Sequence, residues 1–131
     1  MFEGFNQKRM AGQGATLNVL TGGTAANGLP PVLMIHGYPQ THVVWRHLAP
    51  RLAETRPVVC PDLRGYGDSD CPPSAPDHTP YSKRAMAAEL VKIMADLDFD
   101  TFDVVGHDRG ARVGHRLCMD FPEKVRRFCS L

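Results

Sequence analysis

The chain has 131 residues, of which 43% are hydrophobic and 22% charged, and its formal net charge is +1. This is the composition of an ordinary globular domain with enough residues for one core, and the small net charge indicates neither nucleic acid nor an anionic membrane surface as a partner. No apolar run approaches the length of a membrane span. The four cysteines show neither a C-x-x-C pair nor a metal-ligand spacing, so we expect a reducing, cytoplasmic setting and no metal site.

Short apolar runs alternate with helical patterns along the chain. Residues 1–30 are rich in Gly, Asn and Thr, and the alternation at 16–20 predicts one strand of an opening antiparallel pair. The elements predicted after it are strands at 31–35, 57–60, 101–105 and from 125, and helices at 43–54, 81–97 and 111–119, with an irregular proline-rich segment at 71–80. Alternating strands and helices indicate a mostly parallel sheet flanked by helices. We therefore expect one α/β unit, with 1–30 as its entry and 31–131 as its βα units.

The turn after the strand at 101–105 carries the most informative motif. Gly106-His107-Asp108-Arg109-Gly110 lies between an apolar run and a helical stretch, which is the setting of a nucleophile elbow, G-x-Nuc-x-G, here with aspartate as the nucleophile. Aspartate is ionised at neutral pH, since its reference pKa is about 3.9, and it can attack a saturated carbon to form an ester that water then cleaves. The alternative is a plain turn in which Asp108 caps the helix. The flanking strand and helix favour the elbow.

Two further loops should lie beside this turn. His36-Gly37-Tyr38-Pro39-Gln40 follows the strand at 31–35, and the acidic, glycine-containing loop 62–70 follows the strand at 57–60. Ligands of open α/β sheets bind outside the carboxyl ends of the strands. The three loops are therefore expected to meet at one site.

Together these segments resemble the α/β-hydrolase superfamily, and within it the fluoroacetate and haloacetate dehalogenases. The similar segments are HGYPQTHVVW at 36–45, DLRGYGDSD at 62–70, YSKRAMA at 81–87 and GHDRGARVGHRLCMDFPEKV at 106–125. The resemblance implies hydrolysis of a small 2-haloacid, such as haloacetate to glycolate and halide, through an aspartyl ester and without metal or organic cofactor. Haloalkane dehalogenases and many epoxide hydrolases typically carry Trp after the nucleophile, so Arg109 favours an anionic substrate.

The resemblance also assigns roles to individual residues. Asp108 would be the nucleophile, and Arg109 and Arg112, three apart on one helix, would clamp the substrate carboxylate. The backbone N–H groups of Tyr38 and Arg109 would form an oxyanion hole, and Tyr38–Pro39 would be a cis bond. The residues expected to shape the site without reacting are His36, Gly37, Pro39, Gly106, His107 and Gly110. The alternatives are that the arginines are surface residues or pair with nearby acids, and that the Tyr38 loop is an ordinary turn.

Hydrolysis of the ester needs a base, normally a histidine oriented by an acid. In the resembled family both follow the nucleophile, but only residues 109–131 follow Asp108 here, and their one histidine, His115, is on the predicted elbow helix. We therefore expect the chain to be the N-terminal part of a hydrolase, inactive alone. The general base, the halide-binding residues, the cap domain and the last strands would lie beyond Leu131.

Two other functions remain open. An epoxide hydrolase would use the same Asp108 but would need tyrosines from a cap to protonate the opening ring. A truncated, inactive α/β-hydrolase relative would fold poorly or act by association, because half a sheet leaves an exposed edge strand. The expected partner is a small anionic 2-haloacid, with no nucleic acid and no membrane, and a homodimer is an option.

Overall fold

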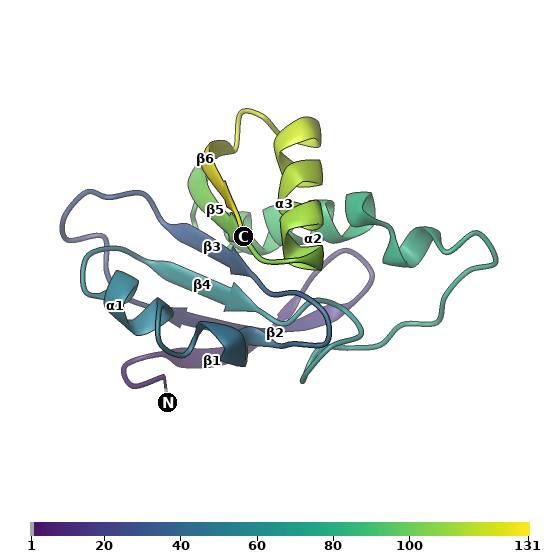
Figure 1. Ribbon diagram of the computed structural model, residues 1–131, viewed down its shortest axis with the longest axis horizontal. Coiled ribbons are helices and arrows are strands. Elements are labelled where there is room, and N and C mark those ends of the chain that lie inside the picture. The colour runs from purple at the N-terminus through teal and green to yellow at the C-terminus, as the bar shows by residue number, and fades with distance from the viewer. Residues whose placement is uncertain (1) are drawn as a thin grey trace.

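The computed structural model describes residues 2–131 as one six-stranded sheet with helices on both faces (Figure 1). The strands are β1 (Asn6–Ala11), β2 (Thr16–Gly22), β3 (Val32–Ile35), β4 (Val58–Pro61), β5 (Phe102–Gly106) and β6 (Val125–Ser130). The helices are the 3-10 turns η1 (His42–Trp45) and η2 (Thr79–Tyr81) and the α-helices α1 (Ala49–Ala53), α2 (Lys83–Asp96) and α3 (Arg109–Asp120). The predicted α/β fold class is confirmed. Within the described residues no helix has the length and apolarity to cross a bilayer.

The strand order β1-β2-β4-β3-β5-β6 explains where a site can form. β1, β2 and β4 pair antiparallel, whereas β4, β3, β5 and β6 run parallel. From β3 the chain moves to β4 on one side and then, through α2, to β5 on the other side. Such a switch in direction opens a crevice at the carboxyl ends of the strands, and the loops after β3, β4 and β5 begin there.

The four central strands β2, β3, β4 and β5 contribute side chains to two separate cores, because successive residues point to opposite faces of the sheet. Leu33 and Ile35 of β3 face α2 and α3, and they pack with Leu90 and Leu117 in one cluster. Val32 and Met34 of the same strand face η1 and α1, in a second cluster that contains the buried Trp45. This alternation fixes the register of β3 and so the position of the loop that follows it.

The predicted single helix at 43–54 is wrong in detail, since the segment forms η1 and α1 with a break between them. Pro50 lies in the first turn of α1. Proline has no backbone N–H, so it cannot donate to a carbonyl of the preceding turn, and it is tolerated only where a helix starts. A second helix therefore begins there instead of continuing the first.

Candidate active site

The turn between β5 and α3 has the geometry of a nucleophile elbow. Asp108 has a φ of 52° and a ψ of −116°, a conformation that costs free energy for a residue with a Cβ. Its side chain makes no capping hydrogen bond to α3, so the helix-capping alternative does not describe this turn. The neighbouring Gly110 has no room for a side chain, because a Cβ there would lie 2.2 Å from the carbonyl oxygen of Ile35. Strand β3 and helix α3 therefore pack in close contact beneath the aspartate.

The elbow backbone is held on both sides by neighbouring chain segments. The His107 N–H donates to the carbonyl of Ile35 at the end of β3, at 3.0 Å. On the other side the Asp108 N–H donates to the carbonyl of Leu131 at 3.1 Å, and the Leu131 N–H donates to Gly106 at 2.9 Å. The nucleophile candidate is thus fixed between β3 and the residue that follows β6.

The loop after β3 meets the carboxylate of Asp108. The Tyr38 N–H donates to Oδ2 of Asp108 at 2.9 Å, and Gly37 permits this approach, because a Cβ there would lie 2.6 Å from Cβ of Asp108. The Tyr38 N–H, followed by the Arg109 N–H, holds the pKa of Asp108 below its usual value, and the charge of Arg112 adds to this effect. Asp108 is therefore ionised at neutral pH. The Tyr38–Pro39 bond is cis, as expected.

Arg109 and Arg112 both begin near Asp108 but line different hollows. The guanidinium carbon of Arg109 lies 4.8 Å from the ring centroid of Tyr38. Arg112 lines an open hollow of about 540 Å³ together with Asp108 and His115. Neither arginine forms an ion pair within residues 2–131, so pairing with nearby acids does not account for them. Both cationic groups are exposed and so accessible to an anion.

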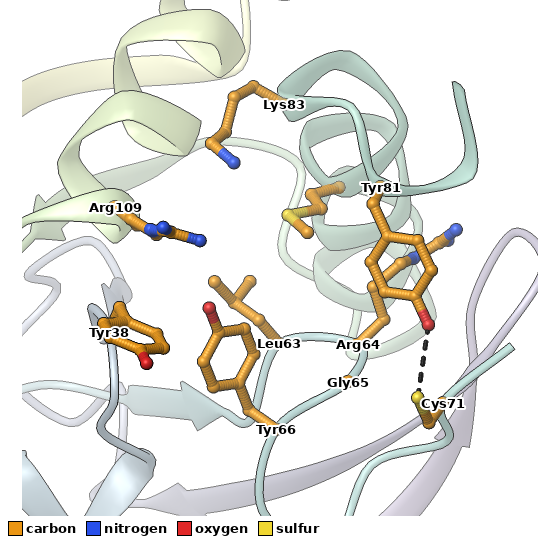
Figure 2. Close-up of a pocket in the computed structure, with 10 residues that line it drawn as sticks. Tyr38, Leu63, Arg64, Gly65, Tyr66, Cys71, Tyr81, Lys83 and Arg109 are labelled. Carbon is orange, nitrogen blue, oxygen red and sulfur yellow. Dashed lines mark hydrogen bonds between the residues drawn. The ribbon is translucent and has the colours of Figure 1, made fainter. Parts of the chain in front are cut away.

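A pocket of about 320 Å³ lies on the Arg109 side of the elbow (Figure 2). Its wall includes Tyr38, Tyr66, Tyr81, Lys83 and Arg109. In Figure 2 the side chains of Lys83 and Arg109 extend toward the same space from two different helices. This part of the site thus combines tyrosine rings with cationic side chains.

The two histidines beside the loops are engaged in hydrogen bonds. His36 is buried; its Nε2 accepts the Leu63 N–H at 2.9 Å, and its Nδ1 lies 3.0 Å from the carbonyl oxygen of Gly37. Nδ1 therefore carries the proton, and burial lowers the pKa of the ring, which keeps it neutral. His107 contacts the amide oxygen of Gln40 through Nδ1 at 3.0 Å. These contacts tie the loop after β3 to its two neighbours.

Asp62 joins three segments below the site. Its buried carboxylate accepts hydrogen bonds from the side chain of Asn18 on β2 at 2.9 Å, from the His42 N–H at 2.7 Å, and from the Asp68 N–H at 3.3 Å. Burial raises the pKa of Asp62, but the hydrogen bonds from His42 and Asn18 outweigh it and the pKa lies below its usual value. These contacts anchor Asp62 and Asp68 in the loop 62–70, whereas Tyr66 of the same loop lines the pocket.

Sequence reasoning did not single out Lys83. The residue follows Ser82, whose hydroxyl oxygen accepts the Ala85 N–H and caps α2. A cation in the first turn of a helix is unfavourable, because the partial charge of that end is positive. That conflict was visible in the order Ser-Lys-Arg at 82–84 and could have marked the position.

Comparison with known proteins agrees with this geometry. The model of the alpha/beta hydrolase fold family matches residues 30–131. The chain belongs to the α/β-hydrolase family. This α/β hydrolase is 46% identical over 125 residues to a fluoroacetate dehalogenase from Burkholderia sp., a match that covers 95% of the chain and 40% of that protein. It is also 40% identical over 108 residues to a soluble epoxide hydrolase from Corynebacterium sp. (strain C12), covering 82% of the chain and 36% of that protein.

The three-dimensional structure is also similar to that of a solved α/β hydrolase. A crystal structure from Nostoc sp. PCC 7120, described as an α/β hydrolase, superposes with a TM-score of 0.94 at 48% identity, and the match covers 99% of this chain and 43% of that one. The chain therefore spans less than half the length of these relatives.

Proposed function

We propose that this α/β hydrolase is a dehalogenase of small 2-haloacids that converts haloacetate to glycolate and halide. The observation that carries the proposal is the ionised Asp108 on a strained elbow, next to two arginines that have no acidic partner in the described chain. A nucleophile of this kind suits displacement at a saturated carbon. The similarity to a fluoroacetate dehalogenase supports the same reaction.

The hydrogen bond from Tyr38 separates the roles of the two carboxylate oxygens. Oδ2 is held by the Tyr38 N–H, which leaves Oδ1 to attack the halogen-bearing carbon. A C–O bond forms, the carbon–halogen bond breaks, and the halide departs with the bonding electron pair. The ester that results keeps Oδ2 as its carbonyl oxygen.

The second step uses the same N–H groups as an oxyanion hole. Water attacks the ester carbonyl carbon, negative charge develops on Oδ2, and the N–H groups of Tyr38 and Arg109 stabilise that charge. The general base takes one proton from the attacking water and passes it to the glycolate oxygen as the tetrahedral species collapses. Asp108 releases the other water proton to solvent and is restored as a carboxylate. The N–H groups of Tyr38 and Arg109 belong to backbone that is already held in place, so they do not have to reorient when the charge develops on Oδ2.

We assign the general base to a part of the protein outside residues 2–131. His36 uses both ring nitrogens in hydrogen bonds, and His107 uses one on Gln40. His115 is on α3 seven residues after Asp108, which corresponds to roughly 10 Å of helix rise. His115 shares a hollow with Asp108, but no acid orients it through a hydrogen bond among the described residues, and His42, His47 and His78 do not line that hollow.

We assign the substrate carboxylate to Arg109 and Arg112. Guanidinium groups bind carboxylates through paired N–H donors, and a carboxylate held near the first turn of α3 would bring the adjacent carbon to Asp108. Such orientation is a large part of the catalytic effect in displacement reactions. The two arginines line different hollows, so the carboxylate would sit between them, over the start of the helix.

Epoxide hydrolysis is the second candidate, because the chain is also similar to epoxide hydrolases. It would use Asp108 and the oxyanion hole in the same way. An epoxide has no charge for Arg109 and Arg112 to bind, whereas a haloacid does. The unpaired cations therefore favour the haloacid.

Halide release from fluoroacetate and chloroacetate tests the proposal. We would compare residues 1–131 with the protein at the full length that its gene encodes, each also as Asp108→Asn. Halide release by the full-length protein that is lost in Asp108→Asn supports the dehalogenase. In ¹⁸O-labelled water, a single turnover should place the label in Asp108, because water attacks the ester carbon. No release, but diol formation from an epoxide, would favour the second candidate, and neither activity would favour an inactive relative.

A further inference from the structure

Lys83 occupies a position that opposes the stability of the fold in three ways. Its side chain is half-buried, it stands in the first turn of α2 where the helix dipole disfavours a cation, and it lies within electrostatic range of two other cations. Burial, and after it the charges of Arg109 and Arg112, lower the pKa of Lys83. An anion bound beside Lys83 would compensate its charge in these surroundings.

Three neighbouring arginines differ from Lys83 because they have acidic partners: Arg64 lines the pocket, and Arg84 and Arg116 share another hollow with Lys83. Arg64 pairs with Glu89 at 2.8 Å, and Arg84 and Arg116 pair with Asp120 at 3.1 and 2.6 Å. Lys83, Arg109 and Arg112 have no such pair among the described residues. The three uncompensated cations thus lie together at the start of α2 and α3.

The cations are divided between two hollows. Arg112 shares one with Asp108, whereas Lys83 and Arg109 share the pocket of about 320 Å³ with Tyr66 (Figure 2). In Figure 2 the Tyr66 hydroxyl is directed toward the side of the pocket on which Arg109 lies. A volume of this size is typical of small-ligand sites and exceeds what a two-carbon acid fills.

Charge balance points to the kind of group that would enter. With the carboxylate of Asp108, the three cations carry a net charge of +2 when all are ionised, so a substrate with a single carboxylate leaves one positive charge uncompensated. A substrate with two acidic groups neutralises the cluster. Arg109 lies between the two positions, and its five N–H donors are enough to contact both groups.

We propose that Lys83, Arg109 and the Tyr66 hydroxyl form a second anion-binding position, so that the preferred substrate is a 2-haloacid with a second, distal acidic group. One carboxylate lies between Arg109 and Arg112, the halogen-bearing carbon faces Asp108, and the distal group enters the pocket at Lys83. The substrate class rests on the dehalogenase function proposed above, but the anion-binding position does not. It can therefore be tested by binding alone.

The binding test uses acetate, malonate and succinate as non-reacting probes on the full-length protein carrying Asp108→Asn. Dissociation constants are measured by calorimetry with and without Lys83→Met. The matched control is Lys92→Met, the same substitution on the same helix, at a lysine that pairs with Asp96 outside the pocket. Loss of a hydrogen bond to a charged group corresponds to about 10-fold or more in affinity.

We expect at least one dianion to bind more tightly than acetate. Lys83→Met should weaken the binding of that dianion about 10-fold while changing the affinity for acetate by less than about 3-fold. Lys92→Met should change neither affinity. The proposal of a second anion-binding position would be overturned if acetate and both dianions bound with equal affinity. It would also be overturned if Lys83→Met weakened the binding of acetate and of the dianions equally.

The catalytic test compares halide release from 2-chlorosuccinate and chloroacetate. Lys83→Met should lower kcat/KM for chlorosuccinate about 10-fold more than for chloroacetate, mainly through KM. Turnover of chloroacetate without turnover of chlorosuccinate would overturn the proposed substrate class. Dianion binding that depends on Lys83, without halide release from either acid, would refute the dehalogenase function and leave the anion-binding position intact.

Discussion

The guanidinium group of Arg109 stacks on the ring of Tyr38, 4.8 Å from its centroid. Tyr38 belongs to the loop after β3 and Arg109 is the first residue of α3, so the stack links that loop to the helix. Tyr38 is 60% exposed, and its ring therefore contributes little to the core. Its position suggests that it orients a cation of the site.

Substitution of Tyr38 tests that role. Tyr38→Phe keeps an aromatic face and should leave KM for chloroacetate within about 2-fold, whereas Tyr38→Leu removes the cation–π contact and should raise KM by about 2- to 5-fold. The backbone N–H that contacts Asp108 is present in both variants, so kcat should change little. A large fall in kcat with unchanged KM in Tyr38→Leu would contradict the role in substrate binding.

Gly110→Ala should disrupt the elbow. The added Cβ would lie 2.2 Å from the oxygen of Ile35 and 2.4 Å from that of His36, and backbone atoms cannot rotate away. We expect a loss of about 2 kcal/mol in the free energy of unfolding, measured by urea denaturation, and loss of ester formation at Asp108. Gly114→Ala on the same helix is the control, since its nearest atom belongs to the Phe128 side chain, which can move; a larger loss there would refute the argument.

The pH dependence of ester formation should report the carboxylate of Asp108. Its folded pKa is depressed, so the reactive, ionised form persists as the pH falls and is lost only below the usual aspartate pKa of about 3.9. The first-turnover rate of halide release should therefore stay flat from neutral pH to about pH 4. Arg112→Met removes a charge that favours ionisation and should move the acid limb to higher pH. Arg116→Met, four residues further along α3, should not move it.

Asp62→Asn should destabilise the protein, because an amide places N–H donors against those of Asn18 and the Asp68 backbone. Hydrogen bonds to charged groups contribute about 1.5–3 kcal/mol each, so we expect a loss of about 2 kcal/mol at pH 7 in urea denaturation. The folded pKa of Asp62 is depressed. Its stabilisation is therefore complete above the unfolded pKa and is lost as the pH falls through the folded value, so the difference between variant and parent should shrink at pH 3. The exposed Asp100→Asn should have no such effect.

Local patterns predicted most of the fold, because strands buried on both faces read as continuous apolar runs and the elbow needs glycines at fixed positions. The sequence also placed Asp108 and Tyr38 in loops at one edge of the sheet. It did not predict the break at Pro50 within the helix expected at 43–54. Helical spacing predicted that Arg109 and Arg112 lie on one face of α3, but in the structure they line different hollows. The stacking of Arg109 on Tyr38 arises from a contact 71 residues apart in the chain, which no local spacing encodes.

The hydrogen bonds of the elbow to Ile35 and Leu131 also determine which parts of the site can adapt to a ligand. Amides held between two neighbouring segments open only when a large part of the sheet opens, so the amides of His107 and Asp108 should exchange with solvent far more slowly than those of the surrounding loops. The backbone that carries Asp108, the attacking residue, is thus held in one position. Differences in size or shape between ligands must be absorbed by the loops after β3 and β4, and changes in selectivity are to be sought there and not at the elbow.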